Sequence, residues 1–349
     1  MSESFSYFDL ILDIFFNYKE DSLKDVEKME KDFKSIGQKY LSYLSFDYSE
    51  RITKIKQGIL LNQKFLLSIT GKYSNNCNKI KSENNSINRK SEINKLRSTL
   101  KLFIRDWTIE GKKERDLTYI SVIEEIKKYF NDINIDNKNW KILVPGAGLC
   151  RLAFEIAKFG FDVDAIEVSY YMIICSNFLF NSNLKMNEFQ IQPLIHSFNC
   201  LKNEDEPFQI FNLPDENIND IMNSKNFGKL NIIPGDFILS FKDKKNCYDS
   251  VITSFFIDTA NNIIQFIEII YNILKKGGIW VNIGPLLYHF HDIQNEVSIE
   301  LSWDEVKKII LKFGFEIKSE KMIDSTYSSI EDSLKKTIYT CLFFSAIKC

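Results

Sequence analysis

The chain has 349 residues, of which 44% are hydrophobic and 14% aromatic, so we expect one domain of roughly 200 residues, a packed core and a substantial second unit. Its 45 basic and 47 acidic residues give a net charge of −2, which argues against a nucleic-acid binder. Its seven cysteines show no CxxC spacing and it has only three histidines, so neither a disulfide framework nor a metal site is favoured.

The first third of the chain is predicted to be mainly helical. Apolar residues recur at intervals of three and four over 23–44 and over 52–69, which predicts a helical hairpin with Ser49 as a candidate N-cap. The same spacing returns over 96–107 and over 120–130. We therefore predict an N-terminal helical domain that spans residues 1–138.

Residues 74–92 interrupt this helical pattern. They are rich in Asn, Ser and Lys and offer almost nothing to bury, so we expect a mobile insertion. The N-terminus carries acids where a secretory signal has Lys or Arg, and no apolar run approaches the roughly 18 residues that span a bilayer. We expect a soluble intracellular protein, cytoplasmic or nuclear, without a membrane partner.

From residue 139 onward, short β-branched runs alternate with amphipathic stretches. The predicted strands are KILVPG, VDAIEV, LNIIPGDF, YDSVITSFFID, GIWVNIGPLL, FEIKSEKMI and YTCLFFSAIK. This alternation predicts an α/β domain over 139–349, with a mainly parallel sheet and an antiparallel hairpin at one edge. The segment 182–226 is too long for an ordinary loop, so we expect a lid or a binding loop there.

The first of these strands ends in two glycines. Gly146 and Gly148 lie in KILVPGAGLC, at the turn into the next helix, where open α/β sheets bind their ligands. A dinucleotide fingerprint would place a third glycine at position 151, and this chain has Arg151 there. NAD and FAD are therefore disfavoured.

Two acidic residues follow at the ends of the next strands. Glu167 lies where a carboxylate can accept both hydroxyls of a ribose. Asp236 lies where a carboxylate can accept a hydrogen bond from an adenine amino group, and Phe237 offers an apolar face to the ring. A ribose without a pyrophosphate indicates S-adenosylmethionine, so the glycines and these residues together predict a Rossmann-like class I methyltransferase core.

Longer motifs make this interpretation more specific. The stretches STLKLFIRDWTIEGKKERD, ILVPGAGLCRLAFEIAKFGF, PGDF, FFIDTANN, GGIWVNIGPLLYHF and ELSWDEVKKIILKFGF resemble the carnosine N-methyltransferase family. The resemblance runs from about residue 15 to the C-terminus, without the Asn-rich insertion. It implies methylation of the imidazole ring of histidyl dipeptides such as carnosine, which gives anserine, with S-adenosylmethionine as cofactor.

The resemblance also implies roles for particular residues. Arg105 would hold the cofactor carboxylate from the helical domain, and further cofactor contacts would come from Gly146, Glu167, Asp236 and Phe237. The dipeptide would be held by Asp258, His289 and Tyr339. The chain departs from the family at Cys150, where glycine is common, and at Leu102, where a polar Gln is common.

Imidazole methylation asks mainly for positioning and for the correct tautomer. A histidine ring with a pKa of about 6.5 is largely neutral at pH 7, and one of its nitrogens carries a usable lone pair. Asp258 could accept the N–H of the other nitrogen and stabilise the cationic product. His289 and Tyr339 would orient the ring or the peptide carboxylate.

Other interpretations of the same residues stay open. Asp258 could cap the helix that follows, Tyr339 could serve packing, His289 could be structural, and Cys150 and Cys247 could be small apolar fillers. The acceptor could instead be a histidine within a protein. An open groove would favour a protein acceptor, whereas a site closed by residues 182–226 would favour a dipeptide. A non-catalytic S-adenosylmethionine-binding protein is a further alternative, and a homodimer is one open state of assembly.

Overall fold

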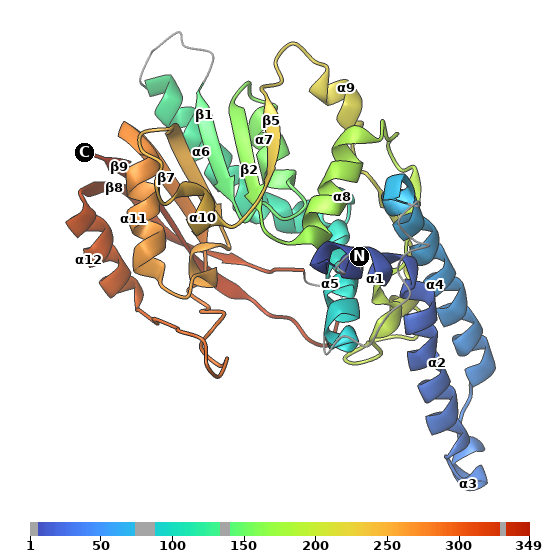
Figure 1. The fold of residues 1–349 in the computed structure, drawn as a ribbon. Helices are drawn as coiled ribbons and strands as arrows, with labels where there is room; N and C mark the ends of the chain where they lie inside the picture. The colour runs from blue at the N-terminus through green and yellow to red at the C-terminus, as the bar shows by residue number, and fades with distance from the viewer. Residues whose placement is uncertain (1–5, 74–87, 133–139, 329–332) are drawn as a thin grey trace, which may run out of the picture. The chain divides into compact units, whose positions relative to one another are not determined.

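The computed structural model describes residues 6–73, 88–132, 140–328 and 333–349 (Figure 1). The chain divides into two compact units. Unit 1 comprises Met1–Glu110, Leu184–Asn217 and Ile330–Lys335, and unit 2 comprises Gly111–Asn183, Ile218–Ser329 and Lys336–Cys349. None of the described helices is long and apolar enough to cross a membrane.

Unit 2 is built on a seven-stranded sheet with the order β5-β2-β1-β6-β7-β9-β8. Its strands are β1 (Lys141–Pro145), β2 (Asp162–Glu167), β5 (Leu230–Pro234), β6 (Tyr248–Ser254), β7 (Leu274–Gly284), β8 (Phe315–Ser325) and β9 (Tyr339–Lys348). The five strands from β5 to β7 are parallel, and β9 is antiparallel to both β7 and β8. The predicted class I methyltransferase sheet with an antiparallel edge hairpin is confirmed.

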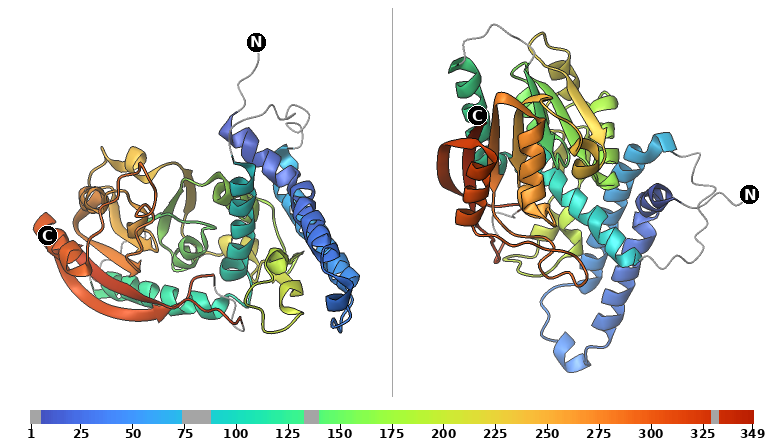
Figure 2. Two further views of the ribbon diagram at one scale, coloured as in Figure 1. Left: turned by 90° about the horizontal axis from the view of Figure 1, so that it is seen from below. Right: turned by 60° about the vertical axis from the view of Figure 1, so that its left-hand side comes forward.

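Helices cover both faces of this sheet (Figure 2). They are α6 (Lys112–Asp132), α7 (Arg151–Ala157), α8 (Tyr170–Asn181), α10 (Phe237–Phe241), α11 (Ile263–Ile273) and α12 (Trp303–Phe313). The short helix α9 (Ile218–Met222) of the same unit contacts α8. Successive strand residues point to opposite faces, so Val251 joins the apolar cluster under α11 and α12, while Ile252 joins the cluster under α6 and α7. This explains why β6 is buried along almost its whole length.

The units do not follow the boundary expected at residue 138. Helix α6 belongs to unit 2, because its apolar residues Val122 and Ile126 are buried against the sheet. Part of the expected insertion 182–226 belongs to unit 1, where it forms the two-stranded sheet of β3 (Phe189–Ile191) and β4 (Phe211–Leu213) with the 3-10 turns η2 (Pro193–His196) and η3 (Glu206–Phe208). The pattern had predicted only a lid or loop there.

The helices of unit 1 are α1 (Tyr7–Phe16), α2 (Tyr18–Lys34), α3 (Gln38–Leu41), α4 (Tyr48–Thr70) and α5 (Arg89–Trp107). Helices α2 and α4 pack together, as the predicted hairpin requires. The N-cap of α4 is Asp47, whose carboxylate accepts the N–H of Ser49 at 2.7 Å, so the prediction of Ser49 as the cap was wrong. Of the expected insertion, residues 74–87 lie outside the described residues, and 89–92 form the first turn of α5.

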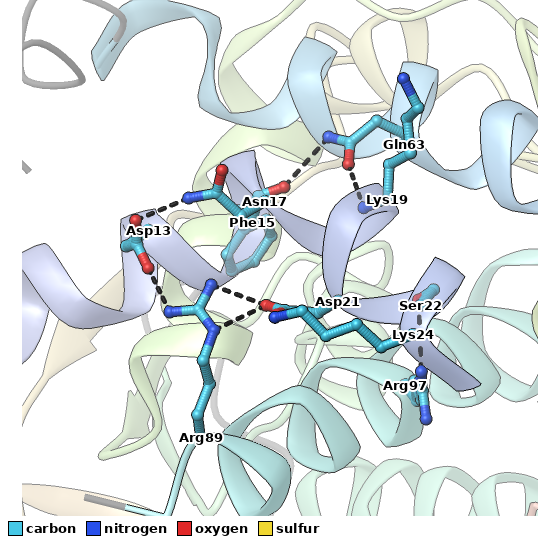
Figure 3. A network of polar contacts seen from close by, with 10 residues as sticks. All are labelled: Asp13, Phe15, Asn17, Lys19, Asp21, Ser22, Lys24, Gln63, Arg89 and Arg97. Carbon is cyan, nitrogen blue, oxygen red and sulfur yellow. Dashed lines mark hydrogen bonds and ion pairs between the residues drawn. The ribbon is translucent and has the colours of Figure 1, made fainter. Parts of the chain in front are cut away.

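Arg89 in this first turn joins α5 to α1 and α2 (Figure 3). Its guanidinium forms ion pairs with Asp13 and with Asp21, whose carboxylates are buried. Burial opposes ionisation of Asp21, but hydrogen bonds from Arg89 and Lys24 lower its pKa. The end of the polar stretch therefore has a structural role.

Arg89→Met is expected to lower the free energy of unfolding by about 1–3 kcal/mol, because two buried carboxylates each lose their ion pair with Arg89 and keep one neighbour, Asn17 for Asp13 and Lys24 for Asp21. A carboxyl whose pKa is lowered by folding stabilises the folded state when the pH is above its pKa in the unfolded state, which is about 3.9. This stabilisation is lost as the pH falls through the lower pKa that the carboxyl has in the folded state. The deficit of the variant should thus be full above about pH 5 and shrink below about pH 4. Urea unfolding across this range tests it, with Lys90→Met, an exposed neighbour, as the control.

Candidate functional site

The two glycines predicted at the end of β1 have left-handed backbones, with φ of +61° at Gly146 and +57° at Gly148. A Cβ atom at Gly146 would lie 2.5 Å from the ring of Phe256, whereas a Cβ at Gly148 would meet no described atom within 4 Å. Gly146 is therefore required by packing inside the protein. Gly148 leaves open space over its backbone, where a ligand can approach.

Glu167, at the end of β2, holds this turn in place. Its Oε2 accepts the N–H of Gly148 at 2.8 Å, and its Oε1 accepts the N–H groups of Val168 and Ser169, both at 2.8 Å. A carboxylate has about four acceptor positions, so one remains on Oε2. Glu167 can thus brace the turn and accept one ligand hydroxyl, which is fewer than the two that we expected from the sequence.

Asp236 and Phe237 follow β5 at the same edge of the sheet. Asp236 is the N-cap of α10, and its Oδ1 accepts the N–H of Leu239 at 2.9 Å. The ring of Phe237 is buried in an aromatic cluster, with ring centroids 5.4 Å from Phe256 and 5.1 Å from Phe266. This burial leaves little of the Phe237 ring for an adenine, so its cofactor contact stays a prediction.

Asp258 lies in the 3-10 turn η4 (Ile257–Thr259) beyond β6 and is 2% exposed. Its Oδ2 accepts the N–H of Leu287 at 2.9 Å, but its buried Oδ1 has no hydrogen-bond partner among the described residues. Burial raises the pKa of this carboxyl, while the Leu287 N–H and the His289 charge oppose the rise. An unpartnered buried acceptor is costly, and it indicates a place for a donor from a ligand.

The alternative that Asp258 caps the following helix is wrong. Helix α11 begins after Asn262, whose side chain accepts the N–H of Ile264 at 3.0 Å. The capping need is met by Asn262, so Asp258 is available for another role.

His289 lies in the turn that follows β7, and Tyr339 is the first residue of the neighbouring strand β9. The side chain of His289 is exposed, and its backbone N–H donates to the carbonyl of Asp258 at 3.1 Å. Tyr339 shares one face of β9 with the buried Cys341, whose pKa is raised to about 11 by burial and then by the Asp258 charge. The structure thus brings the three predicted substrate residues to one end of the sheet.

The family model described as carnosine N-methyltransferase matches residues 82–349. The chain belongs to this family. It is 37% identical to the carnosine N-methyltransferase of Mus musculus over 97% of this chain and 85% of that protein. The Dictyostelium discoideum relative of the same name is 33% identical over 98% of this chain and 76% of that protein. Membership of the carnosine N-methyltransferase family makes this chain a methyltransferase.

One departure from the family now has a physical meaning. Cys150, where the resemblance implies a glycine, is the N-cap of α7 and has a left-handed φ of 60°. Glycine adopts this conformation at little cost, whereas a cysteine there is strained. The thiol is fully buried, which agrees with a packing role.

Sequence reasoning missed Phe255, which precedes Asp258 in the family motif FFIDTANN. Phe255 has a φ of 50°, and its N–H donates to the carbonyl of Ile283 at 2.8 Å. Its ring lies 4.8 Å from Tyr327 and 6.2 Å from Tyr339, centroid to centroid. A bulky residue in the left-handed region is a strained feature that clusters at functional sites, but no local pattern announces it.

Arg105 belongs to unit 1, whereas the other predicted site residues belong to unit 2. It lies in the last turn of α5, is 7% exposed, and its Nη1 lies 2.7 Å from Oδ1 of Asp106. Its contact with the cofactor carboxylate stays a prediction. Within the described residues, no group of three or more His, Cys, Asp or Glu side chains is arranged to hold a metal ion.

Proposed function

We propose that this chain methylates the imidazole ring of histidyl dipeptides such as carnosine, with S-adenosylmethionine as the methyl donor. Family membership and relatives named carnosine N-methyltransferase support this acceptor. The observation that carries the proposal is the buried, unpartnered Oδ1 of Asp258, beyond the carboxyl end of the parallel strand β6. It requires a donor, and the N–H of an imidazole is one.

The residues at this end of the sheet fit S-adenosylmethionine. Gly148 leaves open space above its backbone, Glu167 keeps one acceptor position for a ribose hydroxyl, and Oδ2 of Asp236 has no partner among the described residues. When bound, the cofactor supplies a methyl group on a positively charged sulfur. We propose that Gly146 shapes this site.

Asp258 has two tasks in this reaction. By accepting the N–H of one ring nitrogen, its carboxylate leaves the other nitrogen with a free lone pair that can form the new bond to carbon. The product ring is a cation, and the negative charge of Asp258 stabilises it in a buried setting. Hydrogen bonding from Leu287 holds the carboxylate in one orientation. We propose that His289 and Tyr339 orient the dipeptide.

The cofactor assignment predicts that the protein binds S-adenosylmethionine and its demethylated product, with no comparable binding of NAD. The reason is that Arg151 occupies the position of the third glycine and is buried, with its Nε 2.7 Å from Glu155. Calorimetry with the three ligands checks this. Comparable affinity for NAD would contradict the assignment.

The acceptor is tested by mass spectrometry with a panel of histidyl dipeptides and histidine-containing proteins. We expect the dipeptides to gain one methyl group and the proteins to gain none. Efficient methylation of a protein histidine, with carnosine unchanged, would contradict the proposal. A homodimer and a cytoplasmic or nuclear location stay predictions.

A further inference from the structure

Unit 1 contains a histidine that the proposed methyl transfer does not use. Nε2 of His196, in η2, lies 2.6 Å from the hydroxyl of Tyr18. Asn62 orients this pair, since its Nδ2 donates to the Tyr18 hydroxyl at 3.0 Å and its Oδ1 accepts the N–H of Gln192 at 2.7 Å. The Tyr18 oxygen receives a hydrogen from Asn62, so its own hydrogen can go to Nε2, and the neutral ring then carries its hydrogen on Nδ1.

Two cations on α5 accompany this histidine. Arg97 and Lys101 are one turn apart on the same face of α5, and η2 packs against this helix. Through Nη2, Arg97 contacts Asp25 at 2.7 Å and Ser22 at 3.2 Å, the second of which Figure 3 shows. Its buried Nε has no hydrogen-bond partner in the described part of the chain. Lys101 is half-buried and likewise has no ion pair or hydrogen bond with a described residue.

Arg97 has a counter-ion in Asp25, whereas Lys101 has no ion pair with a described residue. Burial, and then the charges of Arg97 and Lys101, lower the pKa of His196. Burial and the charge of Arg97 also lower the pKa of Lys101. The Tyr18 hydroxyl supplies no negative charge, because burial raises its pKa to about 12. Crowded, partly desolvated cations destabilise a fold unless an anion compensates for them.

We propose that Arg97, Lys101 and His196 form a binding site for a small oxyanion, a carboxylate or a phosphate group, within unit 1. The Nε–H of Arg97 is buried without an acceptor among the described residues. The ammonium of Lys101 and Nδ1 of His196 likewise have no hydrogen bond with a described residue. Charge-assisted hydrogen bonds from such donors to oxyanions are short and strong. This site goes beyond the proposed methyl transfer and does not depend on it.

Calorimetry of the full chain with inorganic phosphate and with succinate, at matched ionic strength in sodium chloride, tests the site. We expect at least one of them to bind, and the one that binds identifies phosphate or carboxylate as the ligand chemistry. Lys101→Met should weaken this binding by about tenfold or more. Lys90→Met, an exposed lysine on the same helix, should leave it unchanged.

A second readout keeps the test independent of the variants. In the wild-type protein, the NMR signals of the His196 ring should shift on addition of the anion that binds. Absence of binding by both anions, an unmoved His196 signal, or equal weakening by Lys90→Met would overturn the proposal.

Discussion

Asp258→Asn is expected to slow methylation of carnosine by roughly tenfold to hundredfold. A charge-assisted hydrogen bond contributes about 1.5–3 kcal/mol, and each 1.36 kcal/mol is about one decade in rate. With its oxygen accepting from Leu287, the amide would present an NH₂ group where Oδ1 now lies, so the acceptor for the ring N–H and the charge that stabilises the product are both lost. Affinity for S-adenosylmethionine should hardly change, because we propose that Gly148, Glu167 and Asp236 contact the cofactor.

The stability of the same variant separates a functional role from a structural one. Burial raises the pKa of Asp258 in the folded protein. Such a carboxyl stabilises the fold fully only when the pH is below its pKa in the unfolded state. This stabilisation is lost as the pH rises through its pKa in the folded state. At pH 7 the Asn variant should therefore be as stable as the wild type or more so. The exposed Asp243→Asn serves as the control for both measurements. Wild-type turnover in Asp258→Asn would remove this residue from the mechanism.

Gly146→Ala is expected to have the largest effect on the fold of unit 2. Its left-handed φ costs a residue with a Cβ about 1–2 kcal/mol, and overpacking a core costs about a further 1–3 kcal/mol. The added Cβ would lie 2.5 Å from the Phe256 ring, which is held by stacking on Phe266 at 4.9 Å. We expect a clear loss of stability in denaturant unfolding and weak cofactor binding.

Two matched glycine variants show whether the turn also receives a ligand. Gly148→Ala and Gly277→Ala both place a Cβ at a left-handed φ, of +57° and +76°, and neither Cβ meets a described atom within 4 Å. They should therefore lose similar stability, about 1–2 kcal/mol. Only Gly148→Ala should weaken binding of S-adenosylmethionine in calorimetry. Equal cofactor affinity in the two variants would contradict the placement of the ligand over Gly148.

The sheet was predictable because each strand carries its own signal. KILVP and YDSVITS are short β-branched runs bounded by turns, and both became strands with residues buried on two faces. Glu167 is the last residue of β2, and Gly146 and Asp236 lie one and two residues beyond the ends of β1 and β5. Ligand-binding residues at the carboxyl ends of parallel strands are a general property of this architecture.

The remaining features depend on contacts that are distant in the sequence. The amphipathic pattern of α6 predicts a helix but cannot say that its apolar face covers the sheet. Phe237 is buried because Phe256 and Phe266, which come later in the sequence, pack against its ring. The role of Asp258 depended on whether Asn262 or Asp258 caps α11, and both residues are good caps. Only the fold decides between them.

We propose above all that this chain transfers a methyl group from S-adenosylmethionine to an imidazole nitrogen of a histidyl dipeptide. This proposal is tested most directly by incubating the wild-type protein with carnosine and cofactor labelled with ¹³C at the methyl group, followed by NMR of the product. We predict a labelled methyl on one ring nitrogen and none elsewhere. Label on the terminal amine, or unmodified carnosine beside a labelled protein histidine, would contradict the account.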